Sequence, residues 1–330
     1  MVGVAADDTP WHLSPTSRDD IAARAVALVL GHQLEVARQR EPGTLAGDAE
    51  DLHQYRVAIR WSRSVLAAAR GVVPDDRRAR AGQRLTRLAR LTSPVRDLDV
   101  FIDDLPGVVA RADPADNPGA DNPGAGTPGV QDLVAVLQRW RGEAAAVLAA
   151  EMRGPEGAET MRAWRAASDL HLVGGDPRGS RATEPAGEVA GDMVASAFRR
   201  ARKVGRAAAE SDDLEHWHDL RKALKRLRYL LEAFGPMYDS DELEGLVRPL
   251  RKLQNRIGRL QDLRVQDTLL VALAAESDHR GDPVPAATAR RLAVLLDAEV
   301  DRVHHGCLTA WTAFDTPATS AAARRLTAAG

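Results

Sequence analysis

Two stretches of similar sequence decide the fold of this 330-residue chain: HQYRVAIRWSRSVL at 53–66 and HDLRKALKRLRYLL at 218–231. Successive residues of an α-helix are turned by about 100°, so residues three and four positions apart share a face. The leucines of the second stretch therefore gather on one face, and its histidine and most of its cations gather on the other. The first stretch repeats this pattern, so each stretch predicts an amphipathic helix with one strongly basic face. The predicted buried faces consist of Tyr55, Ile59, Ser62 and Leu66 in the first stretch and Leu220, Leu224, Leu227 and Leu231 in the second.

The two stretches are related by a constant offset (218 − 53 = 165 residues), and this offset also holds beyond them. Without any gap, it aligns RDLDV at 96–100 with QDLRV at 261–265. A gapless register over two helices and their connection indicates an internal duplication. Identical pairs at this offset include His53 with His218, Arg56 with Arg221, Arg63 with Arg228, Asp97 with Asp262, and Leu98 with Leu263.

The segments around the two stretches also have the pattern of helices, because apolar residues recur three and four positions apart and no strand-like alternation occurs. We therefore expect an all-α protein made of two tandem four-helix bundles that are related by the duplication. Proline is expected to end the first helix at Pro42-Gly43 and to interrupt the third at Ser93-Pro94. The expected division is a flexible tail at 1–17, a first bundle at 18–170 with a disordered loop at 106–129, a linker at 171–187, and a second bundle at 188–330.

The composition excludes several classes of protein. The formal net charge is −2, so the overall charge predicts no partner, and the distribution of charge matters more. Cys307 is the single cysteine, which excludes a disulfide framework and a multi-cysteine metal cluster. The sequence contains neither a basic N-terminal region followed by an apolar segment nor an apolar run long enough to span a membrane. We therefore expect a cytoplasmic protein.

The basic faces of the two stretches predict an anion-binding surface. A charged helix face is most often a solvated face, but solvated faces usually mix the two signs, because Glu–Lys pairs four residues apart stabilise a helix. A stripe of one sign costs repulsion and favours an anionic partner. Arginine dominates these stripes, and guanidinium groups bind phosphate oxygens in bidentate fashion. The helix that follows each stretch is basic as well, with Arg87 in the first copy and Lys252, Arg256 and Arg259 in the second. In the second copy this helix also has a predicted apolar row, which consists of Leu250, Leu253, Ile257 and Leu260.

The histidine of each stretch could be a metal ligand, a phosphate acceptor or a hydrogen-bond donor. A metal site needs three or four convergent ligands, whereas His53 and His218 are surrounded by cations, so we expect no metal. Asp97 and Asp262 follow expected helix breaks, where capping a helix or holding a neighbouring arginine is the simplest role. No phosphate-binding loop, dinucleotide-binding fingerprint, nucleophile elbow or zinc-protease motif is present in the sequence, so we expect neither catalysis nor a cofactor.

The two stretches resemble the signature of the CHAD domain, the conserved histidine α-helical domain. The resemblance is carried by His53-x-x-Arg56-Val57-x-x-Arg60-x-x-Arg63, by His218-x-x-Arg221-x-x-x-Lys225-Arg226-Leu227-Arg228, and by RDLDV at 96–100, which resembles the family's second motif. It extends over about residues 18–325. The resemblance implies two four-helix bundles related by a pseudo-twofold axis, with both basic stripes facing a shared channel that binds inorganic polyphosphate. It also implies association with polyphosphate granules and, because no ExExK motif is present, a stand-alone form without the triphosphate-tunnel domain.

Two positions of the first copy depart from the family pattern. Trp61 stands where the second copy has Arg226 and where the family usually has a second base. Ser62 stands where the second copy has the apolar Leu227. We therefore expect the first copy to contribute the weaker half of the channel.

The interpretation that follows is binding of inorganic polyphosphate in a basic groove. One alternative is histidine phosphotransfer or another phosphate-metabolising activity, because an exposed histidine on a helical bundle is typical of phosphotransfer domains. A second alternative is nucleic-acid binding, which the absence of aromatic residues between the bases disfavours. No membrane is expected as a partner. The predicted phosphate-binding residues are His53, Arg56, Arg60, Arg63, Arg87, His218, Arg221, Lys222, Lys225, Arg226, Arg228, Lys252, Arg256 and Arg259.

Overall fold

The computed structural model describes residues 17–112, 128–170, 179–211 and 213–328. Within these ranges the chain is all-α, as predicted, and its only pairing of the β type is an isolated bridge between Ile21 and Pro185. None of the described helices combines the length and the apolar character that a membrane span needs. The helices are α1 (Ala22–Ala46), α2 (Ala49–Ala68), α3 (Asp75–Ala112), α4 (Val130–Arg153), α5 (Pro155–Ser168), α6 (Ala186–Ala209), α7 (Leu214–Ala233), α8 (Ser240–Arg280), α9 (Pro283–Phe314) and α10 (Pro317–Ala328), with a short 3-10 helix η1 (Gly235–Met237) after α7.

The two stretches that decided the fold form α2 and α7, which begin in the same way. The carboxylate of Asp48 accepts the backbone N–H of Asp51 at 2.8 Å, and the carboxylate of Asp213 accepts that of Glu215 at 2.9 Å. Each aspartate satisfies an N–H group that the first turn of a helix leaves without a partner. The two helices also begin and end at the same offset (214 − 49 and 233 − 68 both equal 165). That the two halves arose by duplication stays a prediction.

The predicted apolar faces are buried. Ile59 and Leu66 of α2, and Leu220 and Leu227 of α7, are at most 1 % exposed. Burying a leucine or isoleucine side chain contributes about 1.5–3 kcal/mol, so these rows are strong determinants of where α2 and α7 pack. The predicted row on α8 is also buried. It consists of Leu250, Leu253, Ile257 and Leu260.

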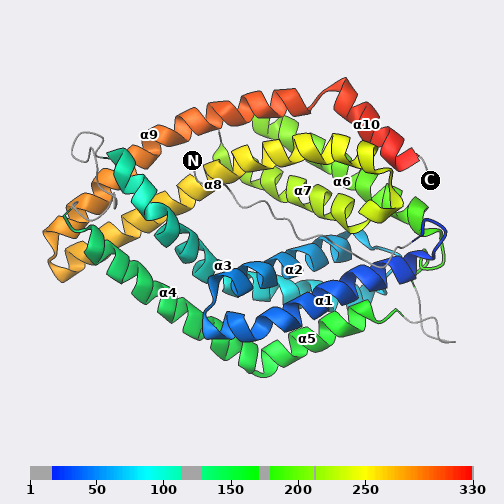
Figure 1. Cartoon of the computed structure of the whole chain (residues 1–330), viewed down its shortest axis with the longest axis horizontal. Helices are drawn as coiled ribbons and strands as arrows, with labels where there is room; N and C mark the ends of the chain where they lie inside the picture. The colour runs from blue at the N-terminus through cyan, green and yellow to red at the C-terminus, as the bar shows by residue number, and fades with distance from the viewer. Residues whose placement is uncertain (1–16, 113–127, 171–178, 212, 329–330) are drawn as a thin grey trace.

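The buried apolar residues form two clusters, and each cluster takes residues from both halves of the chain. The larger cluster joins α1, α2, α5, α6, α7 and α10 to the nearer parts of the long helices. The smaller cluster lies at the far end, where the distal parts of α3, α4, α8 and α9 converge, at the left of Figure 1. The predicted division into a first and a second four-helix bundle is not tested by this arrangement and stays a prediction.

Prolines do not end helices where the sequence predicted. Pro42 lies inside α1, which continues to Ala46 and ends at Gly47, a glycine in the left-handed region with φ of 87°. Pro94 lies inside α3, which runs unbroken to Ala112. A proline in a helix leaves the carbonyl four residues earlier without its donor. Both prolines are exposed on the helix surface, so water can solvate that carbonyl, and packing of the flanking turns keeps the helix continuous.

Two helices extend into the segments that the sequence predicted to be connections. The sequence predicts a disordered loop at 106–129, but residues 106–112 belong to α3 and include the buried Val108 and Val109. Residues 113–127 of that loop, 171–178 of the linker and 1–16 of the tail lie outside the described residues. The second half begins within the predicted linker, because α6 starts at Ala186.

Replacing Pro94 by alanine is expected to raise the free energy of unfolding by about 1–3 kcal/mol. Alanine restores the missing N–H group and is about 3 kcal/mol more favourable than proline inside a helix, while the unfolded chain regains some entropy. Denaturant unfolding followed by circular dichroism measures the change. A loss of stability instead would show that the conformation imposed by Pro94 is needed for α3 to reach both core clusters.

Candidate functional site

The basic faces of α2 and α7 are brought together because the two helices pack against each other (Figure 1). The rings of Trp61 and Tyr229 lie 5.7 Å apart between their centroids and fill this contact. Both aromatic residues are almost fully buried. The sequence placed a basic stripe on each helix, and the packing decides that the stripes meet.

A groove of about 1040 Å3 opens along this contact and is lined by α2, α3 and α7. Arg60 and Arg63 of α2 line it together with Lys222, Lys225 and Arg226 of α7. All five of these cations were predicted as phosphate-binding residues. No carboxylate occurs among the described residues that line the groove.

The third wall of the groove is α3, which adds Arg78, Arg87 and Arg90. Only Arg87 of these had been predicted as a site residue. Gly82 and Thr86 lie on the same face, which leaves the space between the arginines open. The signal in the sequence was the recurrence of arginine and small residues three and four positions apart. Five of the eight groove cations belong to the first half of the chain, and the weaker contribution expected of that half stays a prediction.

Three of the groove cations are partly neutralised by carboxylates. Arg78 pairs with an aspartate of its own helix at 2.8 Å, and Arg87 pairs with Glu151 of α4 at 2.7 Å. Lys222 pairs with Asp219 at 2.9 Å. The other five have no carboxylate within ion-pair distance in the part of the chain that the structure describes. They are Arg60, Arg63, Arg90, Lys225 and Arg226.

Burial and like charge make the empty groove electrostatically unfavourable. Burial lowers the pKa of Arg63, and the neighbouring Arg226 and Arg90 lower it further. Burial and the neighbouring Arg200 and Arg70 lower the pKa of Arg226 in the same way. Neighbouring positive charges that lower one another's pKa values repel each other, so an anion in the groove would relieve this repulsion. Arg70 and Arg200 extend the positive field beyond the groove lining and were missed in the sequence.

The floor between α2 and α7 carries a buried set of opposite charges. Arg56 donates to Thr92 Oγ1 at 2.8 Å and to Ser93 Oγ at 3.1 Å. Its Nε atom and those of Arg60 and Arg221 are buried without a hydrogen-bond partner among the described residues. An unsatisfied buried donor costs about 1–3 kcal/mol, so these three Nε atoms are unfavourable features that packing elsewhere must offset.

Two carboxylates face these arginines from the neighbouring long helices. Burial raises the pKa of Asp97, against the opposing effect of Arg56. Burial likewise raises the pKa of Asp262, against the opposing effect of Arg221. Both aspartates lie within continuous helices, α3 and α8, so the predicted capping role is wrong. Their charge acts on the neighbouring arginines, which was the other predicted role.

Five predicted residues of the two signature helices are not on the lining of the groove: His53, Arg56, His218, Arg221 and Arg228. His218 Nδ1 lies 2.7 Å from the side-chain oxygen of Gln261, which accepts a hydrogen bond from the imidazole N–H. His53 is half-buried. The Arg228 guanidinium lies over the ring of Tyr229, 5.3 Å from its centroid. Its Nε atom lies 3.7 Å from a carboxylate oxygen of Glu232.

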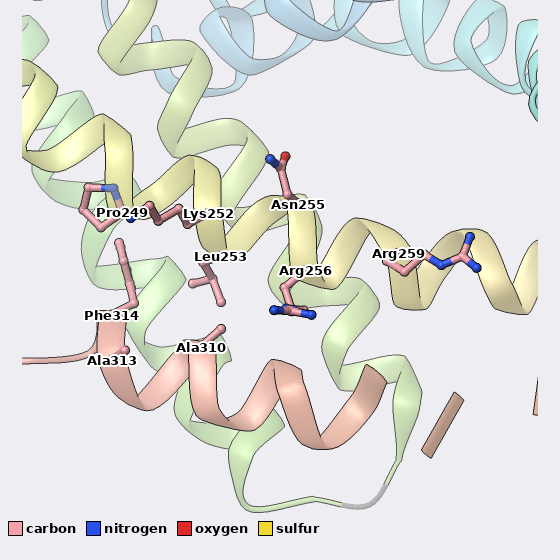
Figure 2. Close-up of a pocket in the computed structure, with 9 residues that line it drawn as sticks. All are labelled: Pro249, Lys252, Leu253, Asn255, Arg256, Arg259, Ala310, Ala313 and Phe314. Atoms are coloured by element: carbon pink, nitrogen blue, oxygen red, sulfur yellow. The ribbon is translucent and has the colours of Figure 1, made fainter. Parts of the chain in front are cut away.

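The three predicted residues of α8 are not brought to the groove. Lys252, Arg256 and Arg259 line a separate pocket of about 580 Å3 between α8 and α9 (Figure 2). Arg256 points toward α9, and Asn255 points to the other side of α8. Arg259 donates to Glu299 at 2.9 Å. The sequence could not show that these residues lie away from the groove, because α8 is basic on both sides of its apolar row.

The described residues thus define an all-α protein with a cationic groove between two central helices. The family model of the CHAD domain matches residues 28–271, and the chain belongs to this family. Comparison with curated proteins gave no match.

Two solved structures share the fold. The CHAD domain from the plant Ricinus communis is 22 % identical with a TM-score of 0.63, and the match covers 90 % of this chain and 97 % of that one. PptA from Streptomyces chartreusis is 16 % identical with a TM-score of 0.64, and the match covers 89 % of this chain and all of that one. At these identities the similarity shows the fold alone.

Proposed function

We propose that this chain binds inorganic polyphosphate in the groove between α2, α3 and α7, without catalysing a reaction on it. The observation that carries the proposal is the lining, where eight cations from three helices converge and no described carboxylate joins them. An extended anion with regularly spaced phosphates fits such a lining better than a compact one, because the cations are spread along the helices. Association with polyphosphate granules is part of the same proposal.

The physical argument rests on charge and on the kind of cation. Arginine predominates in the groove, and its planar group donates to two phosphate oxygens at once. The guanidinium group of Arg60 lines the groove without a carboxylate partner among the described residues, so it can donate to an anion. Binding would also relieve the repulsion between groove cations. Nucleic acid is a weaker candidate, because Tyr229 is the only aromatic residue on the described lining and is 2 % exposed.

Calorimetric titration with medium-chain polyphosphate at low and at physiological salt tests the proposal, with single-stranded DNA of equal charge as the control. Binding that neutralises several phosphates releases counterions, so the affinity is expected to fall steeply with salt. A strong preference for polyphosphate over DNA is the expected result. Equal affinity for both would reduce the protein to a general polyanion binder, and no binding to either would refute the proposal.

The affinity for polyphosphate is expected to rise as the pH falls. Burial and neighbouring cations hold the pKa of Lys225 well below its usual value, so raising the pH removes this positive charge earlier than for an ordinary lysine. The pKa values of Asp97 and Asp262 are raised, so lowering the pH removes two negative charges from the floor. Both changes favour the anion at lower pH. Titration in buffers of different ionisation enthalpy measures the expected proton uptake, and an affinity independent of pH would contradict it.

A further inference from the structure

Lys225 has surroundings that set it apart from the other lysines of the chain. It lies in the middle of α7 and lines the groove. The groups that act on its charge are Arg60 from α2, Arg221 and Arg228 from its own helix, and Asp262 from α8. Three of these four are cations. No carboxylate of the described residues lies within ion-pair distance of its amine.

Lys222, one turn earlier on the same helix, provides the contrast. Its amine donates to Asp219 at 2.9 Å, and its side chain is 61 % exposed. The chain contains two further lysines, Lys203 and Lys252, and both are exposed. Lys225 is therefore the one lysine of the sequence whose amine is withdrawn from water into a like-charged groove.

These surroundings favour the neutral amine. Burial lowers the pKa of Lys225, and Arg60, Arg221 and Arg228 lower it further, while Asp262 opposes them. The neutral amine of a lysine is a nucleophile, whereas the ammonium form is not. Each unit by which the pKa falls raises the neutral fraction about tenfold while the ammonium form predominates.

The groove also supplies the means to hold an electrophile that carries a phosphate. Arg60, Arg63 and Arg226 line the same groove as Lys225, and none of them is paired with a described carboxylate. Guanidinium groups bind phosphate oxygens and stabilise the charge that develops on a phosphate leaving group. A small acyl phosphate bound in this way would have its carbonyl carbon beside a neutral amine.

We propose that Lys225 is a modification site that small acyl phosphates acylate after their phosphate has bound to the groove arginines. The amine nitrogen of Lys225 attacks the carbonyl carbon, a C–N bond forms, and the C–O bond to the phosphate breaks. Phosphate leaves with the bonding electron pair, and the proton lost by the nitrogen passes to the leaving phosphate or to water. The step needs no oxidant or reductant. It converts a titratable cation at the centre of the groove into a neutral amide.

The consequence for ligand binding rests on the proposed function, whereas the modification itself does not. Acylation removes one positive charge from the groove and adds bulk to its lining. If the groove binds polyphosphate, the acylated protein is expected to bind it more weakly. Acyl phosphates would then act as chemical signals that lower occupancy of the groove.

The test uses the full chain and two acetylating reagents at pH 7.5, acetyl phosphate and the N-hydroxysuccinimide ester of acetic acid. Mass spectrometry of digests gives the rate of acetylation at each of the four lysines. Acetyl phosphate is expected to modify Lys225 severalfold faster than Lys222, because the surroundings of Lys225 favour the neutral amine and Lys222 is held as the ammonium form by Asp219. The ester carries no phosphate, so it reports the reactivity of the amine alone.

The double variant Arg63→Gln/Arg226→Gln separates binding of the reagent from reactivity of the amine. It is expected to slow acetylation of Lys225 by acetyl phosphate severalfold and to leave the rate with the ester nearly unchanged, because neither arginine is among the groups that lower the pKa of Lys225. The proposal would be overturned if acetyl phosphate modified Lys225 no faster than Lys222, Lys203 and Lys252. It would also be overturned if the double variant left the rate of acetylation of Lys225 by acetyl phosphate unchanged. Neither result depends on polyphosphate binding, so failure here and failure of the proposed function are distinguishable.

Discussion

Polyphosphate binding is expected to weaken at least about thirtyfold when Arg63 and Arg226 are both replaced by glutamine. Each arginine that contacts phosphate contributes about 1–3 kcal/mol, and 1.4 kcal/mol corresponds to a factor of ten. Arg63 belongs to α2 and Arg226 to α7, so the double variant removes one cation from each side of the groove. Calorimetric titration at low salt measures the change in Kd, and the slope of affinity against salt should fall as well.

The same double variant is expected to fold as stably as the original chain. The charge of Arg226 lowers the pKa of Arg63, and those of Arg200 and Arg70 lower the pKa of Arg226, so removing both charges relieves repulsion in the folded state. The thermal midpoint Tm should therefore stay the same or rise. A combination of weaker binding and unchanged Tm would assign both arginines to the ligand and not to the fold.

A matched control removes two positive charges far from the groove. Arg280 at the end of α8 and Arg290 of α9 lie near the turn between these helices and are 47 % and 57 % exposed. The variant Arg280→Gln/Arg290→Gln has the same net charge as the groove variant. It should bind polyphosphate almost as tightly as the original chain. Equal losses in both variants would show that overall charge, and not the groove, determines the affinity.

Replacing Trp61 by alanine is expected to lower the free energy of unfolding by about 3–5 kcal/mol. The side chain is 1 % exposed and packs on Tyr229 at the contact between α2 and α7, so its removal leaves a cavity at the centre of the larger core cluster. Domains of this size are typically stable by only about 5–15 kcal/mol, so the loss is a large part of the total. Denaturant unfolding followed by tryptophan-independent far-ultraviolet circular dichroism measures it.

Trp140 offers the comparison for this variant. Its indole N–H donates to Glu276 at 2.7 Å, but the side chain is only half-buried, at the distal end of the molecule. Replacing it by alanine should destabilise the protein less than the Trp61 variant does. If both variants lost the same stability, the contact between α2 and α7 would not be the special determinant of the fold that its burial indicates.

The sequence offset alone did not reveal where Trp61 lies. At this offset the tryptophan aligns with Arg226, and the comparison suggested a base missing from the first half of the channel. In the structure Arg226 is exposed in the groove, whereas Trp61 is buried in the contact that brings the two helices together. The contact between α2 and α7 is therefore not symmetric at this position, and the offset in the sequence does not encode that difference.

The sequence by itself determined the helical class, the buried rows of α2, α7 and α8, and the basic character of the faces opposite those rows. These properties are local, because the spacing of apolar and charged residues along one helix fixes which of them share a face. The aspartate caps of α2 and α7 are local in the same sense, since each involves residues two or three positions apart.

Only the tertiary structure decided which basic faces act together. Arg60 and Arg63 meet Lys225 and Arg226 across the groove, whereas Arg256, equally basic in the sequence, faces a different pocket between α8 and α9. The prolines inside α1 and α3 are a second case, because exposure of their helix surface decides whether the lost hydrogen bond is tolerated. The physical reason is the same in both cases: charge and solvation at a position depend on residues far away in the chain, and no short-range pattern encodes which of them packs alongside.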